Sequence, residues 1–287
     1  MPASMTRRFL LAALLATGPL ALATASAAPA AAPGRADPVV RAVSRTTREQ
    51  HPRRIYIAGD STAAQKYADA APETGWGMAL PWYVAPPVEV VNHAMNGRSS
   101  RSFIAEGRLA AILDVIHPGD LLLVQFGHND QKADPAIGTE PWTTYRSFLR
   151  RYLDGARQRG AVPVLLTPAE RRRFDADGNA VATHGQYPDA MRALAAAEGV
   201  ALIDITAQTI ARWQELGPDR SRLNFLFTAA GLEDNTHFNA PGAGAVGQMV
   251  ARGLLATGVL AERDVRRLDE AVPASWITWP ETVPAAT

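Results

Sequence analysis

The strongest constraint on the fold is an alternation of short apolar runs with longer helical patterns. Five runs rich in β-branched residues or leucine are predicted to be strands, namely residues 55–58, 88–91, 121–126, 162–166 and 201–205. Five helical patterns lie between or after them, over residues 103–115, 142–158, 187–198, 206–216 and 241–255. Strands and helices that alternate over short connections favour a parallel sheet with helices on both faces. We therefore expect an α/β fold, a three-layer α/β/α sandwich around a mostly parallel five-stranded sheet.

The first 27 residues are predicted to be a secretory signal peptide. Arg7 and Arg8 precede a mostly apolar run over residues 9–23, and residues 25–27 (Ala-Ser-Ala) form a small-x-small cleavage pattern. The alternative is a membrane anchor, but the run is shorter than the roughly 20 residues that a spanning helix needs. We therefore expect a periplasmic or secreted protein that has no membrane association after cleavage.

The rest of the chain is predicted to hold one domain. We expect a flexible leader over residues 28–53, the α/β domain over residues 54–260, and a tail over residues 261–287 that packs on the domain or is partly flexible. Removal of the signal peptide leaves 27 basic and 28 acidic residues, a net charge of −1. A near-neutral charge gives no reason to expect a nucleic-acid partner. The chain has no cysteine, so cysteine usage does not indicate a compartment.

Polar segments follow three of the predicted strands. Residues 59–62 (Gly-Asp-Ser-Thr) follow the first, residues 92–99 (Asn-His-Ala-Met-Asn-Gly-Arg-Ser) the second, and residues 127–130 (Gly-His-Asn-Asp) the third. In open α/β sheets, ligands bind outside the carboxyl ends of the strands. We therefore expect the three segments to meet at one site.

Each of these segments has a functional and a structural interpretation. Ser61 is either a nucleophile exposed at a strand-to-helix turn or, like Asp60, a helix cap. Gly97 offers either an unobstructed N–H to a ligand or an ordinary turn. Asn129 is either an oxyanion donor through its side-chain amide or an Asx-turn that closes the strand.

A fourth segment, residues 234–237 (Asp-Asn-Thr-His), has an acid three positions before a base. A serine hydroxyl is a poor nucleophile until a base takes its proton, and that base is usually a histidine oriented by a carboxylate. The alternatives for His237 are a metal ligand or a polar histidine in the core. Ser61, Asp234 and His237 together predict nucleophilic catalysis.

In this order, the four segments resemble the blocks of the SGNH (GDSL-like) hydrolase superfamily. The match is closer still to the rhamnogalacturonan acetylesterase family. It covers the Gly-Asp-Ser-Thr-Ala start, residues 92–102, residues 125–130 and the late Asp-x-x-His-Phe, and residues 174–178 and 183–188 also look like that family. The resemblance implies a flavodoxin-like α/β/α fold for the domain over residues 54–260.

The resemblance also implies roles for individual residues. Ser61 would be the nucleophile, His237 the base and Asp234 its partner. The backbone N–H groups of Ser61 and Gly97 and the side chain of Asn129 would form the oxyanion hole. Asp60 looks structural, and His128 is read as a hydrogen-bonding residue behind the site. Neither a cofactor nor a metal ion is implied.

Together with the predicted signal peptide, the resemblance implies an exported serine esterase that removes acetyl groups from a plant cell-wall polysaccharide, with rhamnogalacturonan (pectin) as the expected polymer, through an acetyl-serine intermediate. The alternatives within the superfamily are a lipase, thioesterase, arylesterase or acetylxylan esterase. A non-catalytic carbohydrate-binding protein is the alternative outside enzymes, and the intact Ser61, Asp234 and His237 argue against it. The expected partner is an acetylated polysaccharide or oligosaccharide, and the expected state is a monomer.

Other side chains leave two interpretations open. Trp76 and Trp82 are either a platform for sugars or core residues. The basic run over residues 171–173 either faces an acidic polysaccharide or is a solvated loop, and we favour the loop. Trp276 and Trp279 in the tail are expected to pack against the core.

Overall fold

The structure is a computed structural model that describes residues 52–281. The predicted signal peptide, nearly all of the predicted leader and the last six residues lie outside the described residues. The main sheet has five strands in the order β2-β1-β3-β4-β5, and every neighbouring pair is parallel. Its strands are β1 (Arg54–Gly59), β2 (Glu89–Asn92), β3 (Leu121–Gln125), β4 (Val162–Leu166) and β5 (Ala201–Ile203). A separate antiparallel pair joins β6 (Phe225–Phe227) and β7 (Glu233–Phe238).

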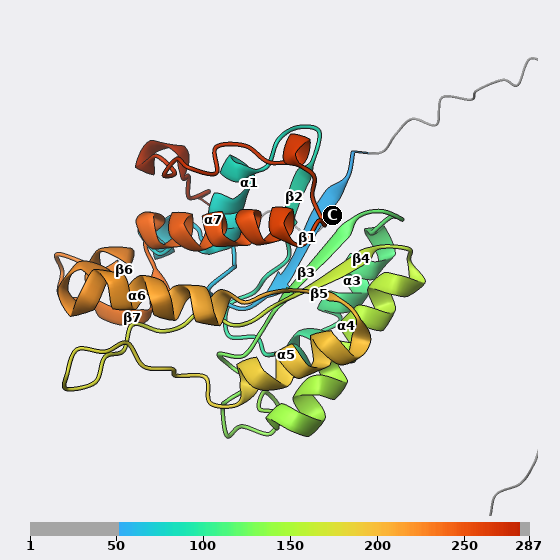
Figure 1. Ribbon diagram of the computed structural model, residues 1–287, viewed down its shortest axis with the longest axis horizontal. Coiled ribbons are helices and arrows are strands. Elements are labelled where there is room, and N and C mark those ends of the chain that lie inside the picture. The colour runs from blue at the N-terminus through green and yellow to red at the C-terminus, as the bar shows by residue number, and fades with distance from the viewer. Residues whose placement is uncertain (1–51, 282–287) are drawn as a thin grey trace, which may run out of the picture. The chain divides into compact units, whose positions relative to one another are not determined.

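Helices cover both faces of the sheet, as Figure 1 shows, with α1 and α7 on one side and α3, α4 and α5 on the other. The helices are α1 (Trp76–Tyr83), α2 (Ser100–Ala105), α3 (Arg108–Val115), α4 (Arg146–Gln158), α5 (Tyr187–Glu198), α6 (Ile205–Ser221) and α7 (Ala240–Ala256). The predicted three-layer α/β/α fold is therefore confirmed.

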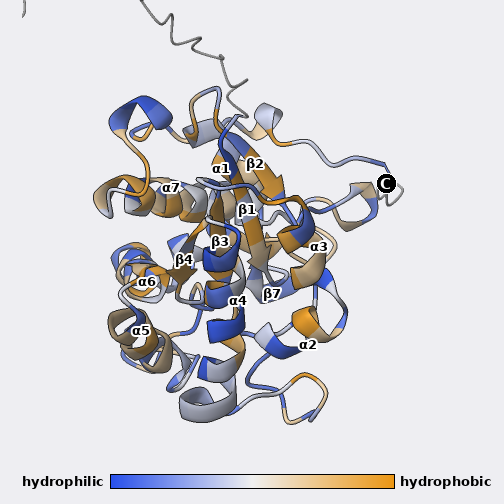
Figure 2. Cartoon of the chain, turned by 90° about the vertical axis from the view of Figure 1, so that its right-hand side faces the viewer, coloured by the Kyte–Doolittle hydropathy of each residue, from blue (hydrophilic) through white to orange (hydrophobic). Residues whose placement is uncertain are grey.

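The strands divide their side chains between two apolar cores, because successive strand residues point to opposite faces. Ile55 and Ile57 of β1 pack in the core that includes α1, α6 and α7. Tyr56 and Ala58 pack in the core that includes α2, α3, α4 and α5. Every residue of β3 is buried, as its continuous apolar run predicts for a central strand. Figure 2 shows the hydrophobic colour concentrated on these central strands.

Several elements differ from the predicted ones. The helix predicted over residues 103–115 is two helices, because Gly107 adopts a left-handed conformation (φ +74°) between α2 and α3. The strand predicted over residues 201–205 ends at Ile203, and Asp204 caps α6 through a hydrogen bond from the backbone of Ala207. Helix α1 was not predicted, because it is apolar on nearly all sides and contains Pro81. The β6–β7 pair was also missed, because β7 is mostly polar.

The tail packs against the domain as far as the structure describes it. The ring of Trp276 meets Trp82 edge to face with 5.5 Å between centroids, and Ile277 is buried in the core. The indole N–H of Trp279 donates to the carbonyl of Glu73 at 2.7 Å. This contact joins the tail to the loop that precedes α1.

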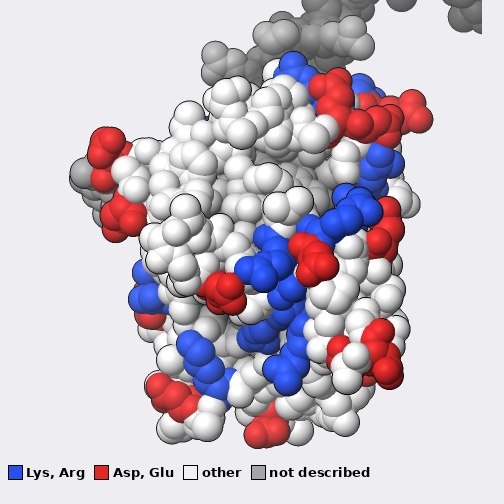
Figure 3. Space-filling view, turned by 90° about the vertical axis from the view of Figure 1, so that its left-hand side faces the viewer, with Lys and Arg blue, Asp and Glu red and all other residues white. Residues whose placement is uncertain are grey.

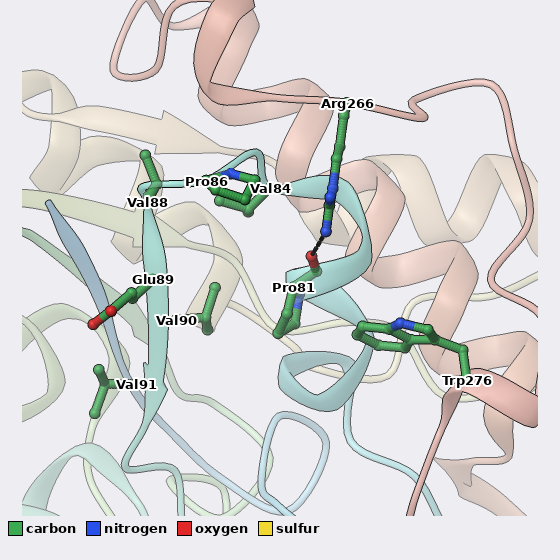
Figure 4. A pocket seen from close by; sticks show the side chains of 9 residues that line it. All are labelled: Pro81, Val84, Pro86, Val88, Glu89, Val90, Val91, Arg266 and Trp276. Atoms are coloured by element: carbon green, nitrogen blue, oxygen red, sulfur yellow. Dashed lines mark hydrogen bonds between the residues drawn. The ribbon is translucent and has the colours of Figure 1, made fainter. Parts of the chain in front are cut away.

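A shallow apolar pocket of about 430 Å³ lies beside the edge strand β2, and its lining includes Pro81 and Trp276 (Figure 4). Arg266 crosses its rim and donates to the carbonyl of Pro81 at 3.3 Å. The predicted site residues do not line it. Between residues 52 and 281, no helix is both long enough and apolar enough to span a membrane.

Candidate active site

The structure brings the four sequence segments together at the carboxyl ends of the central strands. Ser61 follows β1, Gly97 follows β2 and Asn129 follows β3, while His237 reaches the same place from β7. These four residues line one pocket of about 270 Å³, together with three residues that the sequence analysis did not single out. Those three are Glu73, Asn96 and Lys132.

Ser61, His237 and Asp234 form a continuous hydrogen-bonded series. The hydroxyl oxygen of Ser61 lies 2.8 Å from His237 Nε2. On the other side of the ring, His237 Nδ1 lies 2.7 Å from Asp234 Oδ2. With a proton on Nδ1 held by the carboxylate, Nε2 is free to accept the proton of the serine hydroxyl. This arrangement can convert a serine hydroxyl into a nucleophile.

Asp234 is held in its ionised form. Partial burial alone would raise its pKa, but hydrogen bonds from the ring and backbone of His237 and from the backbone of Thr236 outweigh burial and lower the pKa to about 2. A negative charge therefore stays beside Nδ1 throughout the neutral range. That charge stabilises the imidazolium that forms when Nε2 takes a proton.

The turn that carries Ser61 is fixed by its neighbours. Asp60 Oδ1 accepts hydrogen bonds from the backbone N–H of Thr62 at 3.0 Å and from its hydroxyl at 2.7 Å. The carbonyl of Asp60 accepts hydrogen bonds from the backbone N–H groups of Ala63 and Ala64. A Cβ at Gly59 would lie 3.1 Å from the carbonyl oxygen of Gln125, so glycine permits the close approach of β1 to β3 at this point.

Two of the predicted oxyanion donors, Gly97 and Asn129, also line the pocket. Gly97 has φ +78°, a left-handed conformation that favours glycine. The side-chain amide of Asn129 donates one N–H to the carbonyl of Arg98 at 3.0 Å. An amide has two N–H groups, so this bond orients the side chain and leaves a second donor for an oxyanion.

Behind Ser61, a buried polar cluster surrounds Asp60. His128 Nδ1 lies 3.3 Å from Asp60 Oδ2, and the ring of His128 stands edge to face against His184, with 4.3 Å between centroids. Burial by itself raises the pKa of Asp60, but the interactions with His128 and Thr62 lower it to about 2. His184 donates from Nε2 to the carbonyl of Ala169 at 3.0 Å. These residues support the pocket from below and do not line it.

The structure decides the interpretation of Trp76 and bears on that of the basic run over residues 171–173. Trp76 is 1% exposed and its indole N–H donates to Gln125 Oε1 at 2.8 Å, so it is a core residue and no sugar platform. Residues 171–173 lie in a loop in which Arg173 is exposed, as expected, but Arg171 and Arg172 are partly buried. Arg171 contacts Thr183 at 3.3 Å, and Arg172 donates to Asn235 at 2.7 Å, so both guanidinium groups are hydrogen-bonded to other segments of the protein.

Basic side chains gather on one face of the molecule. Figure 3 shows Lys and Arg in a band on the side where β6 and β7 lie in Figure 1. Lys132 lines the pocket with Ser61, and it forms no ion pair with any residue between 52 and 281. In that same part of the chain, no group of three or more His, Asp or Glu side chains is arranged to hold a metal ion.

Comparisons with known proteins show which family the chain resembles. The model of the GDSL-like Lipase/Acylhydrolase family matches residues 57–245. The rhamnogalacturonan acetylesterase RhgT of Bacillus subtilis (strain 168) is 43% identical over 216 residues, which are 72% of this chain and 92% of that protein. The probable rhamnogalacturonan acetylesterase YesY of the same organism is 42% identical over 206 residues, 71% of this chain and 94% of that protein.

A solved structure is similar in fold as well. The crystal structure of Bacillus subtilis protein YxiM has a TM-score of 0.65 at 30% identity, over 72% of this chain and 57% of that chain. The family expected from the four sequence segments is thus confirmed. Because the family model covers well over half of the chain, and RhgT and YesY match it along most of their length, the chain belongs to the GDSL-like lipase/acylhydrolase family.

Proposed function

We propose that this chain is an exported serine esterase that removes acetyl groups from rhamnogalacturonan, a pectic polysaccharide of the plant cell wall. The observation that carries the chemistry is the 2.8 Å contact of the Ser61 hydroxyl with His237 Nε2, backed by Asp234. The support for the polymer is the 43% and 42% identity to proteins named as rhamnogalacturonan acetylesterases.

In the first half of the proposed reaction, Ser61 takes the acetyl group from the sugar. His237 Nε2 accepts the proton of the Ser61 hydroxyl as the oxygen bonds to the carbonyl carbon. The carbonyl oxygen becomes an oxyanion, which receives hydrogen bonds from the N–H groups of Ser61 and Gly97 and from the Asn129 side chain. His237 then gives its proton to the sugar oxygen, the ester bond breaks, and acetyl-Ser61 remains.

In the second half, water replaces the sugar. His237 Nε2 takes a proton from the water while its oxygen bonds to the acetyl carbon, and the same donors hold the second oxyanion. The bond to Ser61 breaks, the proton returns to the serine oxygen, and acetate leaves. Asp234 stays ionised during both halves because its pKa is about 2.

The pocket is suited to a small acyl group. It has a volume of about 270 Å³, and its walls carry the charged side chains of Glu73 and Lys132. A long acyl chain would have to displace water from these charged groups without replacing their hydrogen bonds, which costs free energy. Discrimination against longer chains then arises from steric and desolvation penalties.

Export is the other part of the proposal. The apolar run after Arg7 and Arg8 and the Ala-Ser-Ala cleavage pattern support it. A polymer of the plant cell wall cannot reach an enzyme inside the cytoplasm of the cell that makes it, so export and substrate support each other.

The test is acetate release from acetylated rhamnogalacturonan and acetylated xylan, beside kcat/KM for p-nitrophenyl acetate, butyrate and octanoate. We expect acetylated rhamnogalacturonan to be the better of the two polymers and p-nitrophenyl acetate the best of the three p-nitrophenyl esters. A preference for octanoate would overturn the acetylesterase proposal. A preference for xylan would keep the chemistry of Ser61 and replace the polymer.

A further inference from the structure

Beside Ser61 lies a buried ion pair that the reaction described above does not use. The side chain of Lys66 is 1% exposed, and its Nζ lies 2.5 Å from Glu73 Oε1. The same ammonium donates to Asn96 Oδ1 at 2.7 Å. Burial lowers the pKa of Lys66, and the bond to Glu73 opposes that effect. A charge so far from water is tolerated only when it is paired and hydrogen-bonded.

Both partners of Lys66 line the catalytic pocket. Lys66 therefore fixes the side chains of Glu73 and Asn96 from behind. The backbone of Glu73 is held as well, because its carbonyl accepts the indole N–H of Trp279 at 2.7 Å. The Glu73 carboxylate is thus a rigid hydrogen-bond acceptor in the wall of the pocket, and only 18% of its side chain is exposed.

The position of Glu73 relative to His237 indicates what this acceptor contacts. Glu73 Oε1 lies 4.0 Å from His237 Nε2, the nitrogen that also contacts Ser61. The sugar oxygen that leaves must come within roughly 2.6–3.2 Å of that nitrogen to receive its proton. A sugar bound in this way would have the carbon that bears the ester beside the Glu73 carboxylate. Between residues 52 and 281, Oε2 of Glu73 has no hydrogen-bond donor.

We propose that Glu73 accepts a hydrogen bond from the free sugar hydroxyl next to the acetylated oxygen, and that Lys66 holds it in place for this purpose. The pair then selects esters of carbohydrates over esters of simple alcohols. The inference rests on the proposed esterase function of Ser61. A hydrogen bond to an ionised acceptor is stronger than one between neutral groups. A carboxylate that is already fixed also loses little conformational entropy when the hydrogen bond forms.

The competing explanation is that the ion pair only holds the loop between β1 and α1. In that case, removal of the Glu73 charge would affect every ester alike, because it would disturb Ser61 and His237. Selectivity among esters therefore separates the two explanations. Three probes are suitable: a monoacetylated monosaccharide with a free neighbouring hydroxyl, the fully acetylated form of the same sugar, and p-nitrophenyl acetate.

The experiment compares wild type with Glu73→Gln, which keeps the size of the side chain and removes its charge. We expect kcat/KM for the monoacetylated sugar to fall roughly 10- to 100-fold relative to p-nitrophenyl acetate, the loss typical of one hydrogen bond to a charged group. The fully acetylated sugar has no neighbouring hydroxyl. The ratio of its kcat/KM to that of p-nitrophenyl acetate should therefore be the same in Glu73→Gln as in wild type. Glu215→Gln is the matched control, because Glu215 is exposed and pairs with Arg212 on the surface of α6.

A second variant guards against a folding defect. In the double variant Lys66→Met, Glu73→Gln, the buried ammonium is removed along with its partner, and the same change in selectivity is expected. The role of Glu73 is overturned if kcat/KM falls equally for all three probes. It is also overturned if kcat/KM of neither sugar ester changes relative to that of p-nitrophenyl acetate. If wild type cleaves p-nitrophenyl acetate but neither sugar ester, the carbohydrate function itself fails. If wild type cleaves the sugar esters and Glu73→Gln keeps both ratios, only the inference about Glu73 fails.

Discussion

Asp234 and His237 lie three residues apart on one strand, yet the carboxylate of Asp234 is 2.7 Å from His237 Nδ1. Residues three apart on a regular strand point to opposite faces. Here Phe225 pairs with Phe238 while the next residue, Leu226, pairs with Asp234, so the residues between them bulge out of the ladder. The bulge brings the two side chains into contact, and Asp234 Oδ1 accepts hydrogen bonds from the backbone N–H groups of Thr236 and His237 within it.

Asp234→Asn tests this relationship. The substitution keeps the shape of the side chain but removes the charge that holds the proton on Nδ1, so Nε2 no longer accepts the serine proton. We expect kcat for p-nitrophenyl acetate to fall about 10⁴-fold, as in a serine protease with the same change. Asp269→Asn, at an exposed carboxylate that pairs with Arg252, is the control. A loss of kcat similar to that of the control would mean that another group orients His237.

Ser61→Ala should fold normally, because the side chain is small and, between residues 52 and 281, its hydroxyl is hydrogen-bonded only to His237. Turnover should fall by up to about 10⁶-fold, the loss that follows removal of the serine of a catalytic triad. The measurement is acetate release, with circular dichroism as a check on folding. Activity within about tenfold of wild type would contradict the nucleophile assignment, since that is far above the expected scale.

Asn129→Ala removes one donor from the oxyanion site and leaves Ser61 and His237 in place. We expect kcat to fall roughly 10²–10³-fold with little change in KM, because the bond forms fully only when the oxyanion does. Steady-state kinetics on p-nitrophenyl acetate give both constants. If KM changes and kcat does not, Asn129 binds the substrate in its ground state and is no oxyanion donor.

Stability should depend on pH through His184. Burial, together with His128 and Arg171, lowers the pKa of His184 from 6.5 to about 2. Below about pH 6.5, the unfolded chain binds a proton at this residue and the folded protein does not, so the free energy of unfolding falls as pH falls. Each pH unit in that window removes up to about 1.4 kcal/mol.

Urea unfolding of wild type and His184→Gln at pH 7.5 and at pH 5 measures this effect. The variant lacks the titrating group, so its free energy of unfolding should decrease less between the two pH values. Equal pH dependence in wild type and His184→Gln would show that His184 is not kept neutral by the fold.

The predicted export signal gives a further test. Protein recovered from the periplasm or medium of the expressing bacterium should begin near Ala28, after the Ala-Ser-Ala pattern. Mass spectrometry of the N-terminal peptide measures this directly. Recovery of the exported protein with Met1 still attached would contradict cleavage at this place.

The sequence alone predicted the layers of the fold and, through the resemblance to a known family, the groups that we propose to react. Strand and helix periods are local properties, so the alternation of runs between residues 55 and 255 was enough to predict a parallel sheet with two helical layers. Ser61 and Asn129 were found because parallel strands end at a common edge, and the polar segments after two neighbouring strands must therefore meet. His237 and Asp234 were recognised by their spacing, even though the strand that carries them was missed.

Only the tertiary structure decided what depends on contacts between distant segments. The burial of Trp76 follows from the packing of α1 against α7, and no local pattern marks that packing. Lys66 and Glu73 lie in a loop with no motif, and only the folded chain shows that they pair with each other and that Glu73 lines the pocket. The bulge in β7 depends on its pairing with β6. A sequence pattern indicates which faces of an element are apolar. The environment of a polar side chain is set instead by the elements that pack around it, and those contacts form only in the folded chain.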